Sequence, residues 1–347
     1  MTKRGGKTIL YQSFCPGGEI GRHARFRFWC RKVCKFESYP GQLLQKKTSV
    51  CFFLQILNSS SFFIKFLHQF RSSFLDNFFV FLNFFDTGEF LFILIPTLWI
   101  GYTWKVGSRL FYIILLSSLA NLGLKCMVLE PRPSQIDPSL AVIEISGYSF
   151  PSGAAQTAIL LSTLLVFYWK SKWKWFVSLN FLFWISLSRI YLGAHYPRDI
   201  LAGCFVGFVL LLIFFYIFPL IEKLFTRISE MRAMLLSIIV PLLIMIIFPS
   251  KPVVRLASIG LAAGLGIIVS SRYKIHLPPS KGTWDSIRRA AIGVIGTFVL
   301  YFLASLLPIH VPLLGTFVKN LIIGLWLSLG ASFFCRVIFS NYKAKFI

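Results

Sequence analysis

The chain has 347 residues, of which 56% are hydrophobic, 17% aromatic and 14% charged. A soluble domain typically carries about 25% charged residues, and the mean hydropathy of +0.73 is far above that of a soluble protein. This composition excludes a disordered chain, a coiled coil and a small disulfide scaffold. It predicts an all-α fold, a polytopic bundle of membrane helices.

The net charge is +24, from 36 Lys and Arg against 12 Asp and Glu. Nucleic acid is one conceivable partner for so basic a chain. Cations between membrane spans also set the orientation of a membrane protein, and this explanation is favoured, so no nucleic acid is expected. The seven cysteines show no Cys or Cys/His spacing typical of zinc. We therefore expect no metal and no cofactor.

The N-terminal 87 residues fall into two segments. Residues 1–50 are basic and hold no apolar run long enough for a signal-peptide core, so they are interpreted either as a disordered arm or as a stretch upstream of the native start. Residues 51–87 are rich in Phe but interrupted by polar side chains. That pattern predicts amphipathic helices lying in the membrane interface.

Nine apolar stretches follow, each near the roughly 20 residues that a bilayer requires. They lie at 88–104, 108–129, 153–169, 175–192, 199–220, 233–249, 254–271, 288–308 and 314–338. We assign residues 88–220 to a membrane core and residues 221–347 to further C-terminal transmembrane helices.

The connections between these spans alternate in charge. One set, together with the C-terminal tail, holds sixteen cations: Lys105, Arg109, Lys170, Lys172, Lys174, Lys223, Arg227, Arg232, Arg272, Lys274, Lys281, Arg288, Arg289, Arg336, Lys343 and Lys345. The opposite set holds four: Arg132, Arg198, Lys251 and Arg255. The positive-inside rule places the first set in the cytoplasm.

Three cations at the ends of spans form the first candidate site. Lys125 and Arg132 close the second span and Arg189 closes the fourth, so the alternation puts all three on the outer face. Ionisable groups at membrane depth are costly and usually mark function. Because the planar fork of arginine matches phosphate oxygens, this set indicates a phosphate site. Glu130 is close enough in sequence to hold Arg132, or is simply solvated.

The third span opens with Pro151, Ser152 and Gly153. This order predicts a helix start with Ser152 as its N-cap. A helix N-terminus presents unpaired backbone N–H groups to an anion. The helix start and the three cations therefore indicate the same ligand.

His195 and Asp199 are four residues apart, which on a helix places them on one face. A carboxylate bonded to one ring nitrogen fixes the tautomer and leaves the other nitrogen available as a nucleophile or base. A structural hydrogen bond would explain an isolated pair equally well, and a metal site is less favoured because no further ligand is evident. Beside three phosphate-binding cations, the catalytic interpretation is favoured.

Taken in order, KxxxxxxRP, PSG and SRxxxxxHxxxD resemble the signature of the type 2 phosphatidic acid phosphatase superfamily, which is shared with the vanadium haloperoxidases. The resemblance implies a six-helix core and an integral membrane hydrolase, without a metal, acting on a lipid phosphate or prenyl diphosphate. It implies these phosphate-binding residues: Lys125, Arg132, Ser152, Gly153 and Arg189. It also implies that His195 attacks phosphorus to form a phosphohistidine and that Asp199 orients His195.

The chain departs from that pattern at Ala154, where the family places a His that protonates the leaving group. Loss of a general acid typically costs about 10²–10⁴ in rate. Three explanations compete: an engineered inactive variant, a natural protein that binds lipid phosphate without catalysis, or an enzyme whose leaving group needs little help. A prenyl diphosphate would fit the last, because the phosphate it expels is a far weaker base than an alkoxide.

The remaining expectations concern partners and location. The substrate's tail would lie in the bilayer with its headgroup at the outer face. Gly260-LAA-Gly264 matches the small-xxx-small packing motif, so a homodimer is one candidate assembly. A transporter is disfavoured because no acidic residue lies in the middle of a span. The compact loops and the family pattern favour a bacterial inner membrane, with the site facing the periplasm.

Overall fold

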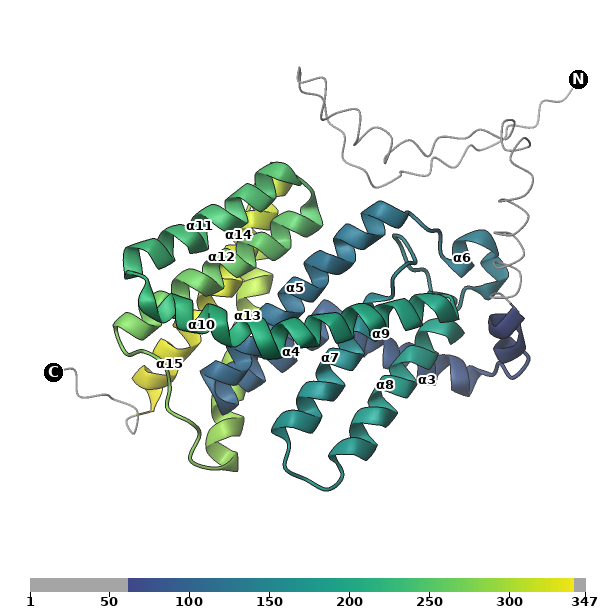
Figure 1. Cartoon of the computed structure of the whole chain (residues 1–347), viewed down its shortest axis with the longest axis horizontal. Helices are drawn as coiled ribbons and strands as arrows, with labels where there is room; N and C mark the ends of the chain where they lie inside the picture. Colours follow the sequence, from purple (N-terminus) through teal and green to yellow (C-terminus); the bar gives the residue numbers. More distant parts are fainter. Residues whose placement is uncertain (1–61, 340–347) are drawn as a thin grey trace, which may run out of the picture. The chain divides into compact units, whose positions relative to one another are not determined.

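The computed structural model describes residues 62–339, which form helices and loops without a strand (Figure 1). Residues 1–61, and with them the predicted basic segment and the start of the predicted interfacial segment, lie outside the described residues. In chain order the elements are α3 (Ser73–Asn83), η2 (Phe84–Asp86), α4 (Gly88–Pro96), η3 (Thr97–Tyr102), α5 (Trp104–Val128), α6 (Pro133–Ile136), η4 (Pro138–Leu140), α7 (Gly153–Tyr168), α8 (Lys174–Tyr191), α9 (Pro197–Leu212), η5 (Ile213–Ile217), α10 (Phe218–Arg227), α11 (Glu230–Ile247), α12 (Lys251–Arg272), α13 (Thr283–Ser305), α14 (Pro312–Leu325), η6 (Trp326–Gly330) and α15 (Ala331–Ile338).

Within the described residues, six helical stretches are long and apolar enough to cross a membrane. They are Trp104–Ile136, Pro197–Phe225, Glu230–Ile247, Lys251–Arg272, Thr283–Ser305 and Pro312–Ile338. A seventh results if Ser73–Asp86 and Gly88–Tyr102, which meet at a bend of 56°, form one span. These findings confirm the all-α, polytopic membrane fold. The spans predicted at 153–169 and 175–192, the interfacial placement of 51–87 and the domain limits stay predictions.

The helices that carry the sequence motifs pack around α7. Helices α7 and α8 form a hairpin (Figure 1), and α9 packs against α7. Helix α3 packs against α8. On the C-terminal side, α12 packs between α11 and α14, while α5 contacts α7, α9 and α12. Helix α5 therefore joins the motif-bearing helices to the C-terminal ones.

Close packing of α7 against α9 depends on Gly203 of α9. A Cβ placed on Gly203 would lie 2.4 Å from the backbone oxygen of Ser152, and real Cβ atoms do not approach backbone that closely. Gly207, one turn later, has the same relation to α7, because its Cβ would lie 2.3 Å from Ile159 Cγ2. The two glycines allow the start of α7 to lie directly against the first turns of α9.

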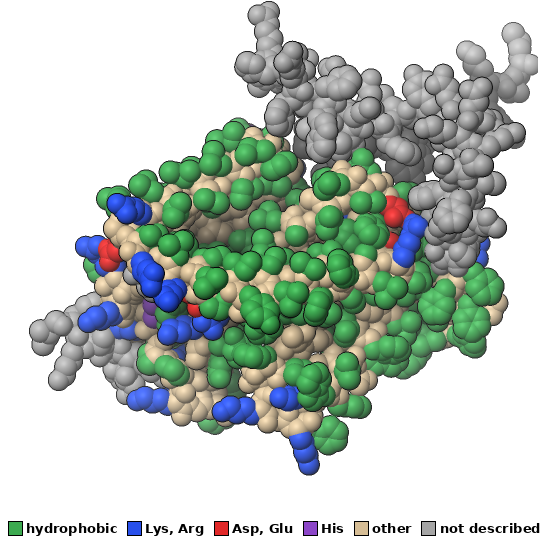
Figure 2. Space-filling model, in the orientation of Figure 1, with side chains coloured by type: hydrophobic (Ala, Val, Ile, Leu, Met, Phe, Trp, Pro, Cys, Tyr) green, Lys and Arg blue, Asp and Glu red, His purple; other side chains and the backbone are tan. Residues whose placement is uncertain are grey.

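The surface is strongly apolar. Hydrophobic side chains cover most of the visible face, and Lys and Arg gather along its lower-left edge, over the ends of α10 and α11 and the turn between α7 and α8 (Figure 2). Large side chains such as Phe74, Leu201 and Ile246 are more than 70% exposed. A soluble monomer rarely exposes so much contiguous apolar area, so this surface fits a protein whose solvent is the bilayer.

Connections predicted for the cytoplasmic side contact one another. Arg109 binds Glu222 through two hydrogen bonds of 2.8 and 2.6 Å. The rings of Trp104 and His276 are stacked with centroids 3.9 Å apart. Arg336 donates to the backbone oxygen of Ile275 at 2.9 Å. These contacts support the predicted grouping of the connections; the orientation relative to the cytoplasm stays a prediction.

A buried ion pair lies in the first turns of α13. Arg289 Nη2 is 2.7 Å from Asp285 Oδ2, and the two side chains are 0% and 9% exposed. Asp285 also accepts a hydrogen bond from the backbone N–H of Lys281 at 3.1 Å, and Arg289 donates to the carbonyl of Pro278 at 2.6 Å. The pair therefore fixes the loop before α13 to the helix itself.

The Gly260–Gly264 motif packs inside this chain. A Cβ on Gly260 would lie 2.8 Å from Leu115 of α5, and one on Gly264 would lie 3.0 Å from Ser237 of α11. Both glycines serve intramolecular helix packing. The homodimer stays a prediction that this motif does not support.

Candidate active site

Arg132 is the most extensively held of the three predicted cations. Helix α5 ends at Val128, and Leu129 adopts a left-handed conformation with φ of 56°, which turns the chain. Arg132 is 5% exposed. Its Nε donates to the carbonyls of Ser146 and Gly147 at 3.2 and 3.1 Å, and its Nη1 donates to that of Ala194 at 2.9 Å. Arg132 thus ties the loop after α5 to the loop before α9.

The same guanidinium fixes the tautomer of His195. Arg132 Nη1 lies 3.2 Å from His195 Nε2. Because an arginine N–H can only donate, Nε2 must accept, so the ring proton of the neutral imidazole is on Nδ1. The lone pair of Nε2 therefore faces the cationic side of the site, which is the arrangement that a nucleophilic imidazole needs.

Asp199 lies behind the imidazole, on the Nδ1 side. Its Oδ2 is 3.6 Å from His195 Nδ1 and accepts hydrogen bonds from the Ser149 hydroxyl and from the backbone N–H of Tyr196, the latter at 2.9 Å. Ser149 Oγ is also 3.4 Å from Nδ1. The carboxylate and hydroxyl together orient the Nδ1–H side of the ring.

The prediction that His195 and Asp199 share one helical face is wrong in its geometry. Helix α9 begins at Pro197 with Tyr196 as its N-cap, so His195 lies in the preceding loop. The proline explains the helix start, because its fixed φ suits the first helical position and its missing N–H costs nothing there. The loop nevertheless brings the two side chains face to face.

Burial is the main electrostatic influence on His195, which is 2% exposed. Burial lowers the pKa of His195 from 6.5 to about 3, and the nearby guanidinium of Arg132 acts in the same direction, while Asp199 opposes them. An imidazole with so low a pKa is neutral throughout the physiological range, so its Nε2 lone pair is available without prior deprotonation.

The helix start at Ser152 is confirmed. Ser152 is the N-cap of α7, and its Oγ accepts from the backbone N–H of Ala155 at 3.3 Å. Its own N–H donates to the carbonyl of Asp199 at 3.0 Å. Asn121 of α5 fixes the turn by donating to the carbonyl of Pro151 and to Gln156 Oε1, both at 3.1 Å. Gly153 packs against Asn121, whose Oδ1 would lie 3.2 Å from an added Cβ.

Arg189 is held from the α3 side. Its Nη1 donates to Asn83 Oδ1 at 2.5 Å, and its Nη2 is 3.4 Å from Asp86 Oδ2. Arg189 is 2% exposed, and its Nε is buried without a hydrogen-bond partner among the described residues. A buried donor of this kind costs free energy unless a ligand satisfies it, which fits an anion site.

Lys125 completes the charged cluster. It lies in the last turn of α5 and interacts electrostatically with Arg132 and Arg189, and also with the carboxylates of Asp86 and Asp199. Three cations therefore face two carboxylates around a neutral imidazole, which leaves excess positive charge for an anionic ligand. The structure brings the side chains of Lys125, Arg132, Arg189, His195 and Asp199 into one cluster, and Ser152 joins it through its backbone N–H.

Ala154 lies in an apolar cluster of its own. It is 3% exposed and belongs to a buried group with Ala158 and Ile185, against which Phe85 and Phe181 pack. The methyl group fills space between α7, α8 and the segment before α4. It offers no group that transfers a proton.

Glu130 pairs with a different arginine from the one predicted. It is 8% exposed, and its carboxylate accepts a hydrogen bond from Arg198 instead of Arg132. Arg132 is already engaged by backbone carbonyls, so it needs no carboxylate partner.

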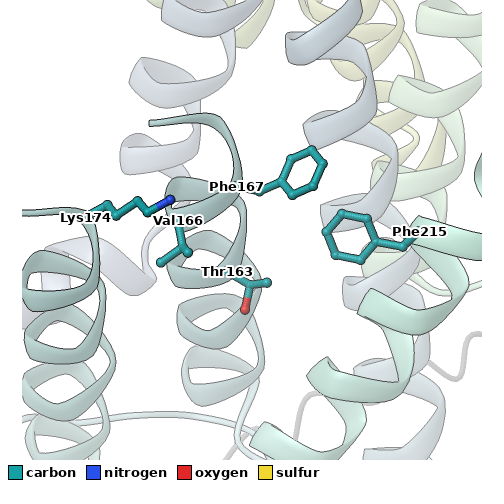
Figure 3. Close-up of a pocket in the computed structure, with 5 residues that line it drawn as sticks. All are labelled: Thr163, Val166, Phe167, Lys174 and Phe215. Carbon is teal, nitrogen blue, oxygen red and sulfur yellow. The ribbon is translucent and has the colours of Figure 1, made fainter. Parts of the chain in front are cut away.

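A separate pocket of about 430 Å³ lies more than two turns further along α7 (Figure 3). Thr163, Val166 and Phe167 of α7, Lys174 of α8 and Phe215 of η5 line it. The rings of Phe167 and Phe215 face each other with centroids 5.1 Å apart. None of the predicted site residues lines this pocket.

Sequence reasoning missed four side chains that complete the site: Ser149, Asn83, Asp86 and Asn121. Ser149 had a usable signal, since it lies two residues before the Pro-Ser-Gly turn. Asn83 ends the Phe-rich helix α3 and Asp86 ends η2, in a stretch whose resemblance to the family gives these two residues no role, and Asn121 lies inside an apolar helix. Their contacts depend on tertiary packing between segments far apart in the chain.

The loop that carries His195 depends on Gly193. This residue has φ of +68°, and a Cβ there would lie 2.1 Å from the backbone oxygen of Leu140. We expect Gly193→Ala to lower stability by at least about 2 kcal/mol, from left-handed strain plus the clash. Thermal melting of the purified protein in detergent checks this, with Gly88→Ala as a matched control because no atom lies within 4 Å of its Cβ position. Equal midpoints for the two variants would contradict the prediction.

Comparison with known families gives two matches. Residues 107–223 match the model of the PAP2 superfamily, and residues 254–341 match that of the PAP2 superfamily phosphatase, transmembrane extension. The first match contains every predicted site residue from Lys125 to Asp199. The second covers α12 to α15, in which the sequence shows no motif of its own. Asn83 and Asp86 precede both matches.

Relatives of known activity match only in part. A lipid A 4'-phosphatase of Bacteroides thetaiotaomicron is 27% identical over 121 residues, which are 31% of this chain and 53% of that protein. An undecaprenyl-diphosphatase of Sulfolobus acidocaldarius is 32% identical over 82 residues, 23% of this chain and 32% of that protein. The crystal structure of Aquifex aeolicus LpxE aligns with a TM-score of 0.40 at 24% identity, covering 44% of this chain and 92% of that chain. The chain thus spans about half or less of the length of these two enzymes.

Proposed function

We propose that this chain, in which residues 107–223 and 254–341 match PAP2 superfamily models, is a member of that superfamily and hydrolyses a lipid phosphate or a prenyl diphosphate at the site around His195. One observation carries the proposal. A neutral buried imidazole directs its Nε2 lone pair toward Arg132, at 3.2 Å, within a cluster of three cations. That combination supplies a nucleophile and an anion site in one place.

The reaction follows from the positions of these groups. A phosphate entering the cluster competes with His195 for the N–H groups of Arg132, which releases the Nε2 lone pair. Nε2 then attacks phosphorus and the bond to the leaving oxygen breaks, which gives a phosphohistidine that water hydrolyses. Asp199 and Ser149 hold the Nδ1 side and stabilise the charge that develops on the ring. Lys125, Arg132 and Arg189 stabilise the phosphoryl oxygens in the transition state.

Ala154 defines the substrate preference within this proposal. The family's proton donor is absent at this position, so a leaving group that needs a proton departs slowly. Two of the relatives, a lipid A 4'-phosphatase and an undecaprenyl-diphosphatase, represent the two kinds of leaving group. We expect this chain to favour the diphosphate, whose leaving phosphate is a weak base. We also propose that this chain catalyses the reaction more slowly than a chain with His at position 154 would.

The alternative function is binding of a lipid phosphate without catalysis. The same cations and helix start support it, because neither depends on proton transfer. In both cases the lipid tail lies in the bilayer and the headgroup reaches the outer end of the helices. We propose that this end lies outside the cytoplasm, on the basis of the charge alternation between the spans, and that it faces the periplasm of a bacterial inner membrane, on the basis of the compact loops and the family pattern.

Phosphate release by the purified protein and by Ala154→His distinguishes these functions, with a prenyl diphosphate and phosphatidate as substrates. We expect Ala154→His to raise phosphatidate turnover by up to about 10²–10⁴-fold, the usual contribution of a positioned general acid, and to affect the diphosphate much less. Equal gains on both substrates would contradict the assigned leaving-group role. If both proteins are folded and release no phosphate from either substrate, the binding function stands instead.

A further inference from the structure

A carboxylate that the phosphate mechanism does not use lies among the three cations. Asp86 Oδ2 is 3.4 Å from Arg189 Nη2, and the same carboxylate interacts electrostatically with Lys125 and Arg132. Its side chain is 31% exposed, so it is accessible from the open side of the site. A carboxylate facing an anion site opposes anion binding, which calls for a chemical reason for its presence.

Asp86 belongs to a segment that contacts the helix on which residue 154 lies. It is the last residue of η2, and η2 packs against α7, the helix that begins at Gly153. Its neighbour Phe85 packs against the cluster that contains Ala154. The segment that carries Asp86 therefore borders the cluster that contains Ala154.

The same segment borders the apolar surface. Phe81 and Phe84, on either side of the turn into η2, are 62% and 36% exposed. Phe74 at the start of α3 is 77% exposed. Large apolar side chains on this surface face lipid, so the acyl or prenyl part of a substrate would leave past α3 and η2. On this path the lipid oxygen would leave past the segment that carries Asp86.

We propose that Asp86 is the proton donor to the leaving lipid oxygen, in the place of the acid missing at Ala154. The inference rests on the proposed function. In the first step Nε2 of His195 forms a bond to phosphorus, the P–O bond breaks with its electron pair on the lipid oxygen, and the Asp86 carboxyl proton passes to that oxygen. In the second step water gives a proton to the Asp86 carboxylate and its oxygen bonds to phosphorus. The N–P bond breaks and its electron pair returns to Nε2.

In this proposal, substrate binding brings about the protonation of the Asp86 carboxylate. In the empty site Asp86 faces Arg189, Lys125 and Arg132. A phosphate entering the cluster neutralises these cations and places negative charge beside Asp86. Repulsion between two anions at one site favours the protonated form of one of them.

A purely positioning role for Asp86 is the competing explanation. Arg189 is already held by the 2.5 Å hydrogen bond from Nη1 to Asn83, and the 3.4 Å contact with Asp86 is the weaker of the two. Loss of Asp86 through positioning alone would weaken substrate binding and raise KM. Loss of a proton donor would lower kcat and leave KM unchanged or lower, because a negative charge is removed from the site.

The test compares Asp86→Asn with the parent protein on phosphatidate and on p-nitrophenyl phosphate, whose phenolate leaves without a proton. We expect kcat for phosphatidate to fall by about 10²-fold or more, and that for the aryl ester by less than about threefold. The double variant Asp86→Asn with Ala154→His is expected to regain phosphatidate turnover. Glu89→Gln is the matched control, since Glu89 is an exposed carboxylate three residues along the chain. It should match the parent protein on both esters.

Two outcomes would overturn the inference while leaving the proposed function intact. One is equal loss on both esters, and the other is failure of the added histidine to restore phosphatidate turnover in a folded double variant. A measurement independent of turnover also tests it. Calorimetry in buffers of different ionisation enthalpy measures how many protons the protein takes up when it binds an alkyl phosphonate. This number should be lower in Asp86→Asn than in the parent protein by up to one proton. Identical uptake in the two proteins would count against Asp86 as the donor.

Discussion

Replacement of His195 by glutamine is expected to reduce phosphate release by roughly 10⁶-fold, the scale observed when the nucleophile of a catalytic triad is removed. Glutamine has a similar size and fills the same buried space, so the fold should persist. It has no lone pair that can attack phosphorus, and its amide cannot form the phosphorylated intermediate. The loss should therefore appear in kcat on every substrate, whatever its leaving group.

Phosphate release and trapping of a radiolabelled phosphoenzyme by an alkaline denaturing quench, in which phosphohistidine is stable, measure this effect together. Label on the parent protein should disappear in His195→Gln. His310→Gln serves as the control because His310 is exposed in a loop far along the chain; it should retain both turnover and label. Persistence of the acid-labile phosphoenzyme in His195→Gln would show that another residue is the nucleophile.

Replacement of Asp285 by alanine is expected to cause the largest loss of stability. It leaves Arg289, with a side chain that is 0% exposed, charged and without its carboxylate. Breaking a buried pair by removal of one partner typically costs about 3–5 kcal/mol, which corresponds to a fall in thermal midpoint of roughly 10 °C. The loop that Asp285 holds through the N–H of Lys281 should open at the same time.

Thermal melting in detergent measures this loss, and two further variants identify its cause. The double variant Asp285→Leu with Arg289→Met should recover most of the midpoint, since replacing both partners of a buried pair by apolar side chains is often close to neutral. Glu230→Gln removes the carboxylate from an exposed pair with Arg272, in which the side chains are 55% and 51% exposed. That variant should melt close to the parent protein. Equal falls in Asp285→Ala and Glu230→Gln would show that burial is not the cause.

Much of the membrane fold was predictable because each span is a local property of composition and length. Helices α11, α12 and α13 begin and end within a few residues of the predicted limits, apart from the start of α13 at Thr283, five residues earlier. The bend of 56° between α3 and α4 was not predictable, since Phe-rich sequence with scattered polar residues fits both an interfacial helix and part of a span.

The candidate site was predictable where a motif fixes the spacing, as for Lys125, Arg132 and Arg189. Details within the motif were not. A spacing of four suggested that His195 and Asp199 share a helix, whereas Pro197 starts that helix two residues after the histidine. Side-chain partners were the least predictable. Glu130 binds Arg198 because the loop before α9 folds back on the end of α5, a contact between segments almost 70 residues apart.

The anchoring of Arg132 has a consequence for the way in which such a site can acquire new substrates. Its Nε and Nη1 are held by the carbonyls of Ser146, Gly147 and Ala194, which every residue type possesses. Substitutions in these loops would keep the acceptors but would shift the nucleophile whenever they moved the backbone. Changes in headgroup preference should therefore accumulate at those positions of α3 and η2 that border the site, apart from Asn83 and Asp86, which contact Arg189. A library of variants confined to that segment would be the efficient route to altered specificity.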